Sequence, residues 1–500
     1  MDVFRTNEHL GVWLGQASSD GDEVMANPIP AANQQALVPA DMDQDQQAQL
    51  SIIRANLKTT WHFFGDFGAL FHPVHDPRNP DLITYPLAAM GFTGVWMFLC
   101  RLEARRQINH LLRGNGPSAA KFQALFGVES CPHGDTVNAL YARLDATQVQ
   151  EVVTGMVGTL IRKKVLYRYR LLDHYFLMAI DGTGRLTFPE RHCAHCLTQT
   201  HNGKTTYYHP VLEAKLVTAN GLVFSVMTEF VENPGEKPTK QDCELKAFYR
   251  LAKRLKHRFP RLPICLLLDG LFAGGPTFAL CDKYRWKYLV VLTEDDLSSV
   301  HQELDALMPL APENHLTVHT GVQSEIKQVF RWRNVHRTCG LNDISYLDSE
   351  KREHILSVME CLETCPDSKG ERKTTRFKWI TSLTVKTNNI RILTNQGGRL
   401  RWKIENEGFN VQKNGGYALE HAYSRDPNAA KVFYFMLQIA HTLAQLTEHG
   451  SLFRKAFPAG VGSAKNIAFR LLEAWRNLRL RTGQLEQLLS ARVQIRLDTS

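Results

Sequence analysis

Apolar and polar positions follow different periodicities in different parts of the chain. Between residues 52 and 170 the apolar residues recur at helical spacing, and 94–112 and 149–170 are expected to be helices. After residue 170 the pattern changes to short, wholly apolar runs, which are typical of buried strands. Helical spacing returns from Leu400 onward, most clearly over 429–446. The pattern predicts that one helical region precedes a sheet in the sequence and that another follows it.

The middle of the chain alternates buried strands with helices. An Asn-Gly pair at 220–221 marks a tight hairpin turn. Helices between apolar strands indicate crossover connections and therefore parallel pairing, so we expect a mixed α/β sheet. The expected order is a strand (174–184), the hairpin (207–231), a helix (240–259), a strand (262–272), a helix (277–286) and a strand (287–294).

Two further regions differ in composition from the rest. Residues 298–395 are polar, with short alternating stretches that predict half-exposed strands, so we interpret them as a β-rich insertion. Residues 1–50 are rich in Gln, Asp, Ala and Pro, and they are too polar to bury a core. We expect them to form a disordered acidic leader.

Charge changes this picture, because the leader hides how basic the rest of the chain is. The whole chain carries a formal net charge of +9. Residues 1–50 hold eight acids and one base, so the remaining residues carry +16. Such a balance permits a polyanionic partner. No apolar run is long enough for a membrane helix, no secretory signal is evident and the ten cysteines are scattered, so we expect a cytoplasmic protein with reduced thiols.

Two apolar strands end in an aspartate followed by glycine, at Asp181 and at Asp269. In an open α/β sheet the carboxyl ends of neighbouring parallel strands face one crevice, so these carboxylates can converge. Carboxylate oxygens suit Mg²⁺ or Mn²⁺. The alternative is that each Asp-Gly pair is simply a turn.

A third element is the segment 398–417, where Arg401 and Glu405 lie four residues apart. At helical spacing this places both on one helix face. The alternative interpretation is an ordinary surface ion pair, which contributes only a few tenths of a kcal/mol.

Together these features resemble the DDE-type insertion-sequence transposases, specifically the bacterial cut-and-paste group with an RNase H-like core and a β-strand insertion. The resemblance covers about residues 171–450, and "ENEGFNVQKNGGYALEH" is its most specific stretch. It implies that Asp181, Asp269 and Glu405 are the catalytic acids and hold two Mg²⁺ or Mn²⁺ ions. Glu407 is the competing third acid.

The chain departs from that group's signature on the last helix, which has a Tyr, an Arg three residues on, a Glu four further on and a Lys seven after that. Gly398 stands at the Tyr position. Position 412 is Gln, and Lys413 lies one place late, as if one residue were inserted near 406–407. The chain therefore looks like a divergent branch.

The implied fold is α/β, an RNase H-like mixed sheet core with a β-rich insertion and flanking helical regions. The expected parts are a leader (1–50), a helical DNA-binding region (51–170), the first part of the catalytic core (171–297), the insertion (298–395), the second part of the core with the catalytic Glu (396–450) and a basic helical region (451–500).

The resemblance also implies a partner, double-stranded DNA, both as terminal inverted repeats and as target, bound by a homodimer in the bacterial cytoplasm at the nucleoid. Arg401 and Lys413 would hold backbone phosphates near the scissile bond. The basic cluster Arg162, Lys163 and Lys164 would add phosphate contacts, unless it is merely a solvated helix face.

The implied activity is DNA strand cleavage and strand transfer at transposon ends. Two alternatives remain: a metal-dependent nuclease with the same core, and a non-catalytic DNA-binding protein derived from such an enzyme. Separately, Cys193 and Cys196, with His201 and His209 nearby, have spacing suited to a structural zinc, although a loop that merely contains Cys and His is favoured.

Overall fold

The computed structural model describes residues 42–235, 240–294, 296–310, 312–321, 325–334, 344–348, 351–366 and 370–497. The expected leader lies outside these residues up to position 41. Within the described residues, no helix is long and apolar enough to cross a membrane.

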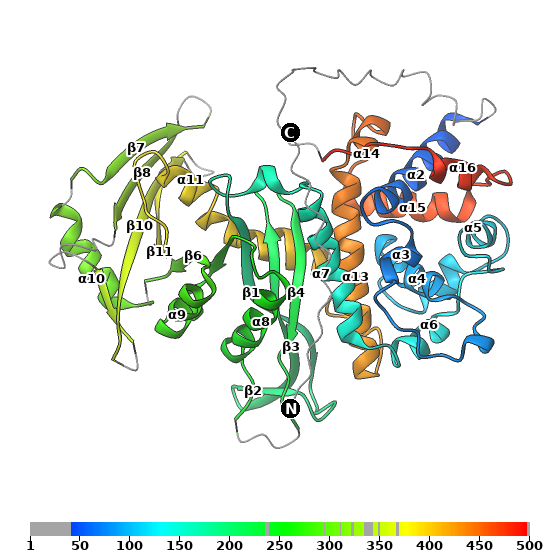
Figure 1. Cartoon of the computed structure of the whole chain (residues 1–500), viewed down its shortest axis with the longest axis horizontal. Coiled ribbons are helices and arrows are strands. Elements are labelled where there is room, and N and C mark those ends of the chain that lie inside the picture. The colour runs from blue at the N-terminus through cyan, green and yellow to red at the C-terminus, as the bar shows by residue number, and fades with distance from the viewer. Residues whose placement is uncertain are drawn as a thin grey trace, which may run out of the picture. The chain divides into compact units, whose positions relative to one another are not determined.

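Helices from both ends of the described chain pack into one helical body (Figure 1). The long helix α13 contacts α2, α4, α6 and α7, and Trp475 of α15 packs among Phe92, Trp96 and Phe122. The regions 51–170 and 451–500 therefore share a core. The helices of this body are α2 (Gln44–Phe64), α3 (Phe67–Phe71), α4 (Leu87–Leu99), α5 (Pro117–Phe126), α6 (Gly134–Tyr141), α7 (Ala146–Arg162), α13 (Pro427–Glu448), α14 (Ser451–Ala456), α15 (Ala464–Asn477) and α16 (Gln484–Ser490), with short turns η1 (Pro80–Leu82), η2 (Ile108–Leu112) and η3 (Tyr167–Tyr169).

Helix α2 begins at Gln44, inside the segment expected to be disordered. Asp43 caps its first turn by accepting a hydrogen bond from the Gln46 N–H at 2.8 Å, and the Gln46 side chain accepts one from the Asp43 N–H. Carboxylates are favourable at a helix N-terminus, where the free N–H groups and the helix dipole attract them. The acidic residues at 43–45 therefore begin a helix, and the expected boundary at residue 50 is wrong.

The middle of the chain forms a mixed α/β sheet, as the sequence predicts. Its central strands follow the order β4-β3-β1-β5-β6, with β3 antiparallel to both β1 and β4, and with β1, β5 and β6 mutually parallel. The expected hairpin turn at Asn220 and Gly221 is present between β3 and β4. The elements are β1 (Phe176–Phe188), β2 (Leu197–His201), β3 (Lys204–Val217), β4 (Val223–Phe230), α8 (Glu244–Arg258), β5 (Ile264–Leu268), η4 (Gly270–Phe272), α9 (Gly275–Tyr284) and β6 (Lys287–Leu292).

The two faces of the sheet bury separate hydrophobic clusters. Alternate residues of β1 and β5, such as Met178 and Leu266, pack with α8 and α9 on one face. Ala179 and Leu267 point to the other face, where Leu400 and Ile404 pack against them. Strand alternation explains the division, since successive side chains point to opposite sides.

The expected insertion is β-rich and extends the same sheet. Strand β11 pairs antiparallel with β6, and the order continues through β10 and β8 to β7 (Figure 1). The elements are α10 (Ser298–Leu307), η5 (Met308–Leu310), β7 (His315–Thr320), β8 (Ile326–Arg333), β9 (Ile344–Leu347), β10 (Glu353–Pro366), β11 (Arg372–Thr381) and α11 (Ile390–Asn395).

The sequence predicts helical structure from Leu400 onward, and the structure there is helical but is not one continuous α-helix. It forms a 3₁₀ turn η7 (Gly398–Trp402), a π-helix η8 (Ile404–Asn410) and a short α-helix α12 (Val411–Asn414). A π-helix accommodates one extra residue within a helix. The extra residue inferred near 406–407 from the sequence falls inside η8.

Candidate active site

Asp181 and Asp269 occupy equivalent positions on neighbouring parallel strands. Ala179 of β1 pairs with Leu267 of β5, and each aspartate lies two residues further along its strand direction. Both therefore lie on the face to which Ala179 and Leu267 point, the face covered by η7 and η8. Backbone N–H groups hold both carboxylates: Gly182 donates to Asp181 at 2.8 Å and Leu271 donates to Asp269 at 3.1 Å.

Arg401 and Glu405 approach these aspartates from η7 and η8. The Arg401 Nη2 atom lies 2.8 Å from Glu405 Oε1, and its Nη1 atom lies 3.5 Å from Asp181 Oδ2. The Arg401 side chain is 7% exposed and that of Glu405 is 38% exposed. The ion pair is thus anchored in the protein on the arginine side and open to solvent on the glutamate side, and it differs from the expected alternative of a surface pair.

The carboxylates crowd negative charge where the pairing of β1 with β5 ends, although β1 itself continues past Asp181 to Phe188. Burial is the main cause that raises the pKa of Asp181 to about 7; Arg401 opposes this rise, and the charges of Glu405 and Asp269 contribute to it. Burial also raises the pKa of Asp269, again against Arg401, and Asp296 and Glu405 add to the rise. One guanidinium faces three carboxylates, so the site carries excess negative charge that a divalent cation can neutralise.

Two further acids, which the sequence analysis missed, lie behind this cluster. A Cβ atom on Gly182 would come within 2.1 Å of Glu244 Oε1, and one on Gly270 within 2.0 Å of Asp296 Oδ2. Burial and the charge of Asp269 raise the pKa of Glu244. The glycine after each aspartate therefore makes room for a carboxylate from the other face of the sheet. The glycine of each Asp-Gly pair was the available signal, and the sequence analysis used only the aspartates.

The competing third acid, Glu407, has a different partner. Its Oε1 atom lies 2.6 Å from the Lys403 Nζ atom. Lys413 forms an ion pair with Glu420 at 2.7 Å, and the residue before it, Gln412, is buried in hydrogen bonds with Gln438 and His441. The structure thus gathers Glu405 with the aspartates and gives Glu407 and Lys413 other ion-pair partners.

The basic cluster Arg162, Lys163 and Lys164 ends helix α7. The Lys163 ammonium donates to the carbonyl oxygens of His62 and Phe63 at 2.8 and 2.9 Å, so it binds the end of α2. Arg162 and Lys164 are exposed.

A buried ion pair lies under η8. Glu213 and Lys215 on β3 are fully buried, with Lys215 Nζ 3.2 Å from Glu213 Oε2. The Lys215 stem packs against Gly408, and its ammonium donates to Gln438 of α13 at 2.9 Å. This pair connects β3, the π-helix and the long helix α13.

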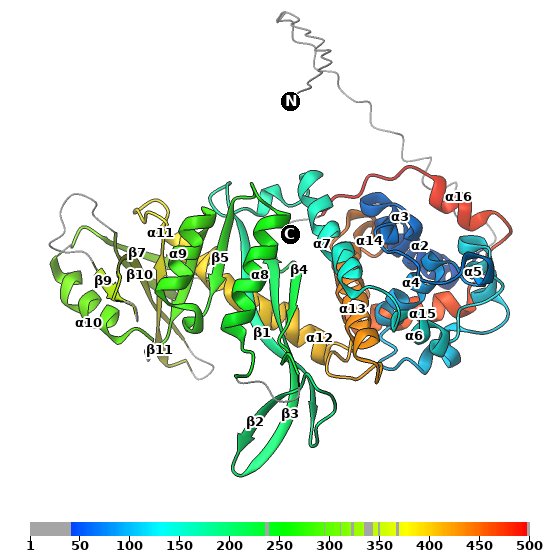
Figure 2. The same cartoon turned by 60° about the horizontal axis from the view of Figure 1, so that its bottom comes forward.

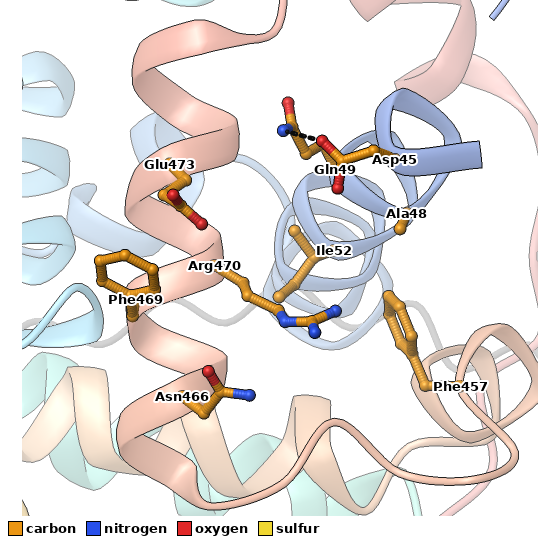
Figure 3. Close-up of a pocket in the computed structure, with 9 residues that line it drawn as sticks. All are labelled: Asp45, Ala48, Gln49, Ile52, Phe457, Asn466, Phe469, Arg470 and Glu473. Atoms are coloured by element: carbon orange, nitrogen blue, oxygen red, sulfur yellow. Dashed lines mark hydrogen bonds between the residues drawn. The ribbon is translucent and has the colours of Figure 1, made fainter. Parts of the chain in front are cut away.

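A cavity of about 240 Å³ lies between α2 and α15 (Figure 3). Its walls include Ile52, Phe469 and Arg470, and none of the three candidate acids. It therefore lies apart from the candidate active site.

Asp181, Asp269 and Glu405 carry the hard oxygen donors that Mg²⁺ and Mn²⁺ prefer. Arg401 lies among them, and the three acids do not form a group whose ligand atoms all lie within 4.8 Å of one another. A comparison with models of known protein families finds no match, and a search of curated proteins also finds none. The site is therefore interpreted from its own chemistry.

Proposed function

We propose that this chain is a DNA transposase that uses two Mg²⁺ or Mn²⁺ ions to cleave DNA strands at the ends of a mobile element and to join them to target DNA. The observation that carries the proposal is the convergence of Asp181 and Asp269, at equivalent positions on parallel strands, with the Arg401–Glu405 pair.

The strand order supports an RNase H-like core within the α/β fold. A three-stranded antiparallel unit, β4-β3-β1, is followed by two parallel strands, β5 and β6, and the helices α8 and α9 form the crossovers. Asp181 lies within β1, the first strand of this unit, Asp269 directly follows β5, and Glu405 lies on a helical segment after an insertion.

Two metal ions bound here would stabilise the entering and leaving oxygens of an in-line displacement at phosphorus. Asp181, Asp269 and Glu405, whose charges interact, would hold these ions. Arg401 holds Glu405 in position and keeps an Nη1 atom directed toward Asp181. Trp402, which is 48% exposed next to Arg401, offers an aromatic face to a base beside the scissile phosphate.

The partners proposed are double-stranded DNA and a second copy of the chain, because two element ends must be cut and joined together. Exposed Arg162 and Lys164, along with the basic C-terminal helices, supply cations for the DNA backbone. Binding should weaken steeply as the salt concentration rises.

The test is a strand-transfer assay with the full chain. Linear duplexes that carry the DNA flanking its coding sequence, with free 3′-hydroxyls, are incubated with a supercoiled plasmid and Mg²⁺ or Mn²⁺. Joined products that require Asp181, Asp269 and Glu405 would support transposition. Cleavage without joining under either metal would assign the chain to the nucleases. The absence of both cleavage and joining would overturn the proposed metal chemistry.

A further inference from the structure

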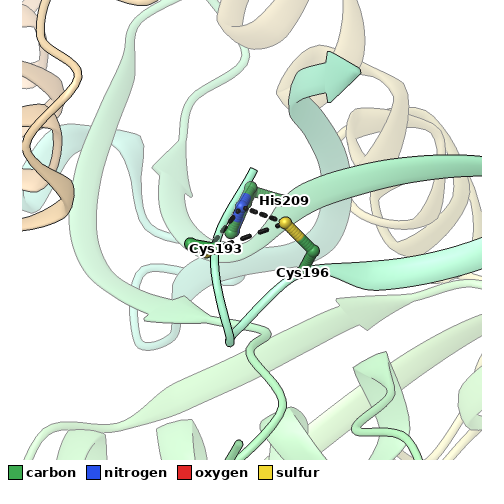
Figure 4. A group of neighbouring side chains, drawn as sticks. All are labelled: Cys193, Cys196 and His209. Atoms are coloured by element: carbon green, nitrogen blue, oxygen red, sulfur yellow. Dashed lines mark hydrogen bonds between the residues drawn. The ribbon is translucent and has the colours of Figure 1, made fainter. Parts of the chain in front are cut away.

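A second group of metal-binding side chains lies at the outer part of the sheet, on the loop between β1 and β2 and on β3. It consists of Cys193, Cys196 and His209 (Figure 4). The Cys193 and Cys196 sulfurs are 3.7 Å apart, and the His209 Nε2 atom lies 3.4 Å from the first and 3.2 Å from the second. His201, which the sequence analysis considered with them, is not part of this group.

These three separations resemble the edges of a zinc coordination tetrahedron. With Zn–S bonds of about 2.3 Å and Zn–N bonds of about 2.0–2.1 Å, tetrahedral angles place two sulfurs about 3.8 Å apart and a sulfur and a nitrogen about 3.6 Å apart. The triad therefore needs only small shifts to hold a Zn²⁺ ion. A disulfide needs the sulfurs at about 2.0 Å and gives His209 no role.

The surrounding backbone holds the two cysteines in this arrangement. The His195 N–H donates to the Cys193 sulfur at 3.3 Å. The buried Asn233 side chain donates to the Cys196 carbonyl at 2.8 Å, and its own backbone bonds to His195. On His209, the buried Nδ1 atom has no hydrogen-bond partner among the described residues, so polar contacts fix the ring through Nε2.

We propose that Cys193, Cys196 and His209 bind one structural zinc ion, with His192 or a water molecule as the fourth ligand. The exposed His192 ring directly precedes Cys193 and stacks on Phe188, whose ring also contacts His209. Zinc would tie the loop after β1 to β3 and thereby fix the base of the β2–β3 hairpin, which extends beyond the rest of the sheet (Figure 2). Beyond its first residue, β2 is half-buried or exposed, so apolar packing gives the hairpin little support.

The inference is independent of the proposed transposase activity, because it concerns different residues. Its test measures zinc by elemental analysis in the full chain, purified under reducing conditions from cells supplied with zinc and without a metal-affinity column. One zinc ion per chain is expected. Cys193→Ser and His209→Gln should each lose most of it, whereas the matched control Cys243→Ser, at an exposed position before α8, should retain it.

Cobalt supplies a second measurement. Co²⁺ bound in place of zinc should give the thiolate charge-transfer band and the tetrahedral d–d bands, and both should weaken in Cys193→Ser, whose half-exposed position tolerates the smaller group. A folded chain without zinc and without these bands would overturn the proposal. Zinc that persists in both Cys193→Ser and His209→Gln would overturn it as well.

Discussion

Arg401 donates to Glu405 across 2.8 Å and reaches toward Asp181 with its other terminal nitrogen, so a single guanidinium links the first and third acids of the site. Glu407, two residues away, bonds to Lys403 instead. The π-helix thus presents two glutamates with different partners, and the pair forms a matched test.

If the chain cleaves DNA as proposed, Glu405→Gln should lower metal-dependent strand cleavage by about 100-fold or more, because it removes the charge of a proposed metal ligand. Glu407→Gln should leave cleavage within a few-fold of the unchanged chain. Single-turnover cleavage of a pre-assembled DNA complex measures both. A larger loss in Glu407→Gln would identify Glu407 as the third acid. Equal losses in the two variants would contradict the assignment of that role to Glu405 alone.

The raised pKa of Asp181 predicts how stability depends on pH without metal. Since the folded state holds this proton up to a pH of about 7 while an unfolded aspartate loses it near 4, folding binds a proton in that interval. The free energy of unfolding should therefore fall as the pH rises from about 4 to about 7. Each unit of pKa shift corresponds to about 1.4 kcal/mol, reduced here by partial exposure.

Urea denaturation at pH 5 and pH 8 in EDTA, for the unchanged chain and for Asp181→Asn, measures this effect. The asparagine variant should lose less stability between the two pH values, because it has no proton to release. Mg²⁺ should bind the unchanged chain more tightly as the pH rises to about 7, since a protonated carboxyl cannot act as a ligand. Parallel stability curves for the two proteins would contradict the assignment.

Gly398 lies against the indole of Trp379, and a Cβ atom there would come within 2.4 Å of Nε1. The indole is fully buried, so it has little space to move. Gly398→Ala should therefore cost about 1–3 kcal/mol of unfolding free energy, and Gly398→Tyr should cost more. Gly155→Ala in helix α7, where no atom lies within 4 Å, is the control and should stabilise by about 0.5–1 kcal/mol.

The buried Glu213–Lys215 pair predicts a large loss on removing one partner. Lys215→Met should lower the unfolding free energy by about 3–5 kcal/mol, because Glu213 would remain buried without its cation. Lys431→Met breaks a partly exposed pair with Glu232 at 2.7 Å and should cost about 1 kcal/mol or less. Thermal and urea unfolding compare the two, and similar losses would show that burial does not govern the effect.

The sheet could be predicted from the sequence because its strands are apolar on both faces. β5 and β6 lie inside the predicted runs 262–272 and 287–294. The Asn220–Gly221 pair lies in the turn between β3 and β4, as its local turn preference predicts. Asp181 and Asp269 could be selected because each follows an apolar run, although β1 continues to Phe188 and only the β1–β5 pairing ends before Asp181. These inferences depend on local periodicity and on the geometry of parallel pairing.

Tertiary contacts decided the parts that the sequence did not predict. The expected helix over 94–112 ends at Leu99, and Arg101 and Glu103 adopt φ values of 53° and 58°. The Arg101 guanidinium lies 3.3 Å from the centre of the Tyr417 ring and donates to the Gly415 carbonyl. Residues more than 300 positions away thus end a helix that local periodicity would continue.

Glu244 shows the same limit at the candidate site. It begins a basic amphipathic helix, where an acid is expected for reasons of helix termini alone. Glu244 lies close to Gly182, and burial and the charge of Asp269 raise its pKa, because α8 crosses over the sheet. The sequence pattern does not specify where this crossover lies.

The insertion shares a continuous hydrogen-bonded sheet with the strands that carry the aspartates, since β11 pairs with β6 and β6 with β5. An insertion joined only by linkers could move independently of the core. Here, moving the insertion relative to the core would break the backbone hydrogen bonds between β11 and β6. A partner that binds β10 would therefore contact the same hydrogen-bonded sheet that carries Asp181 and Asp269.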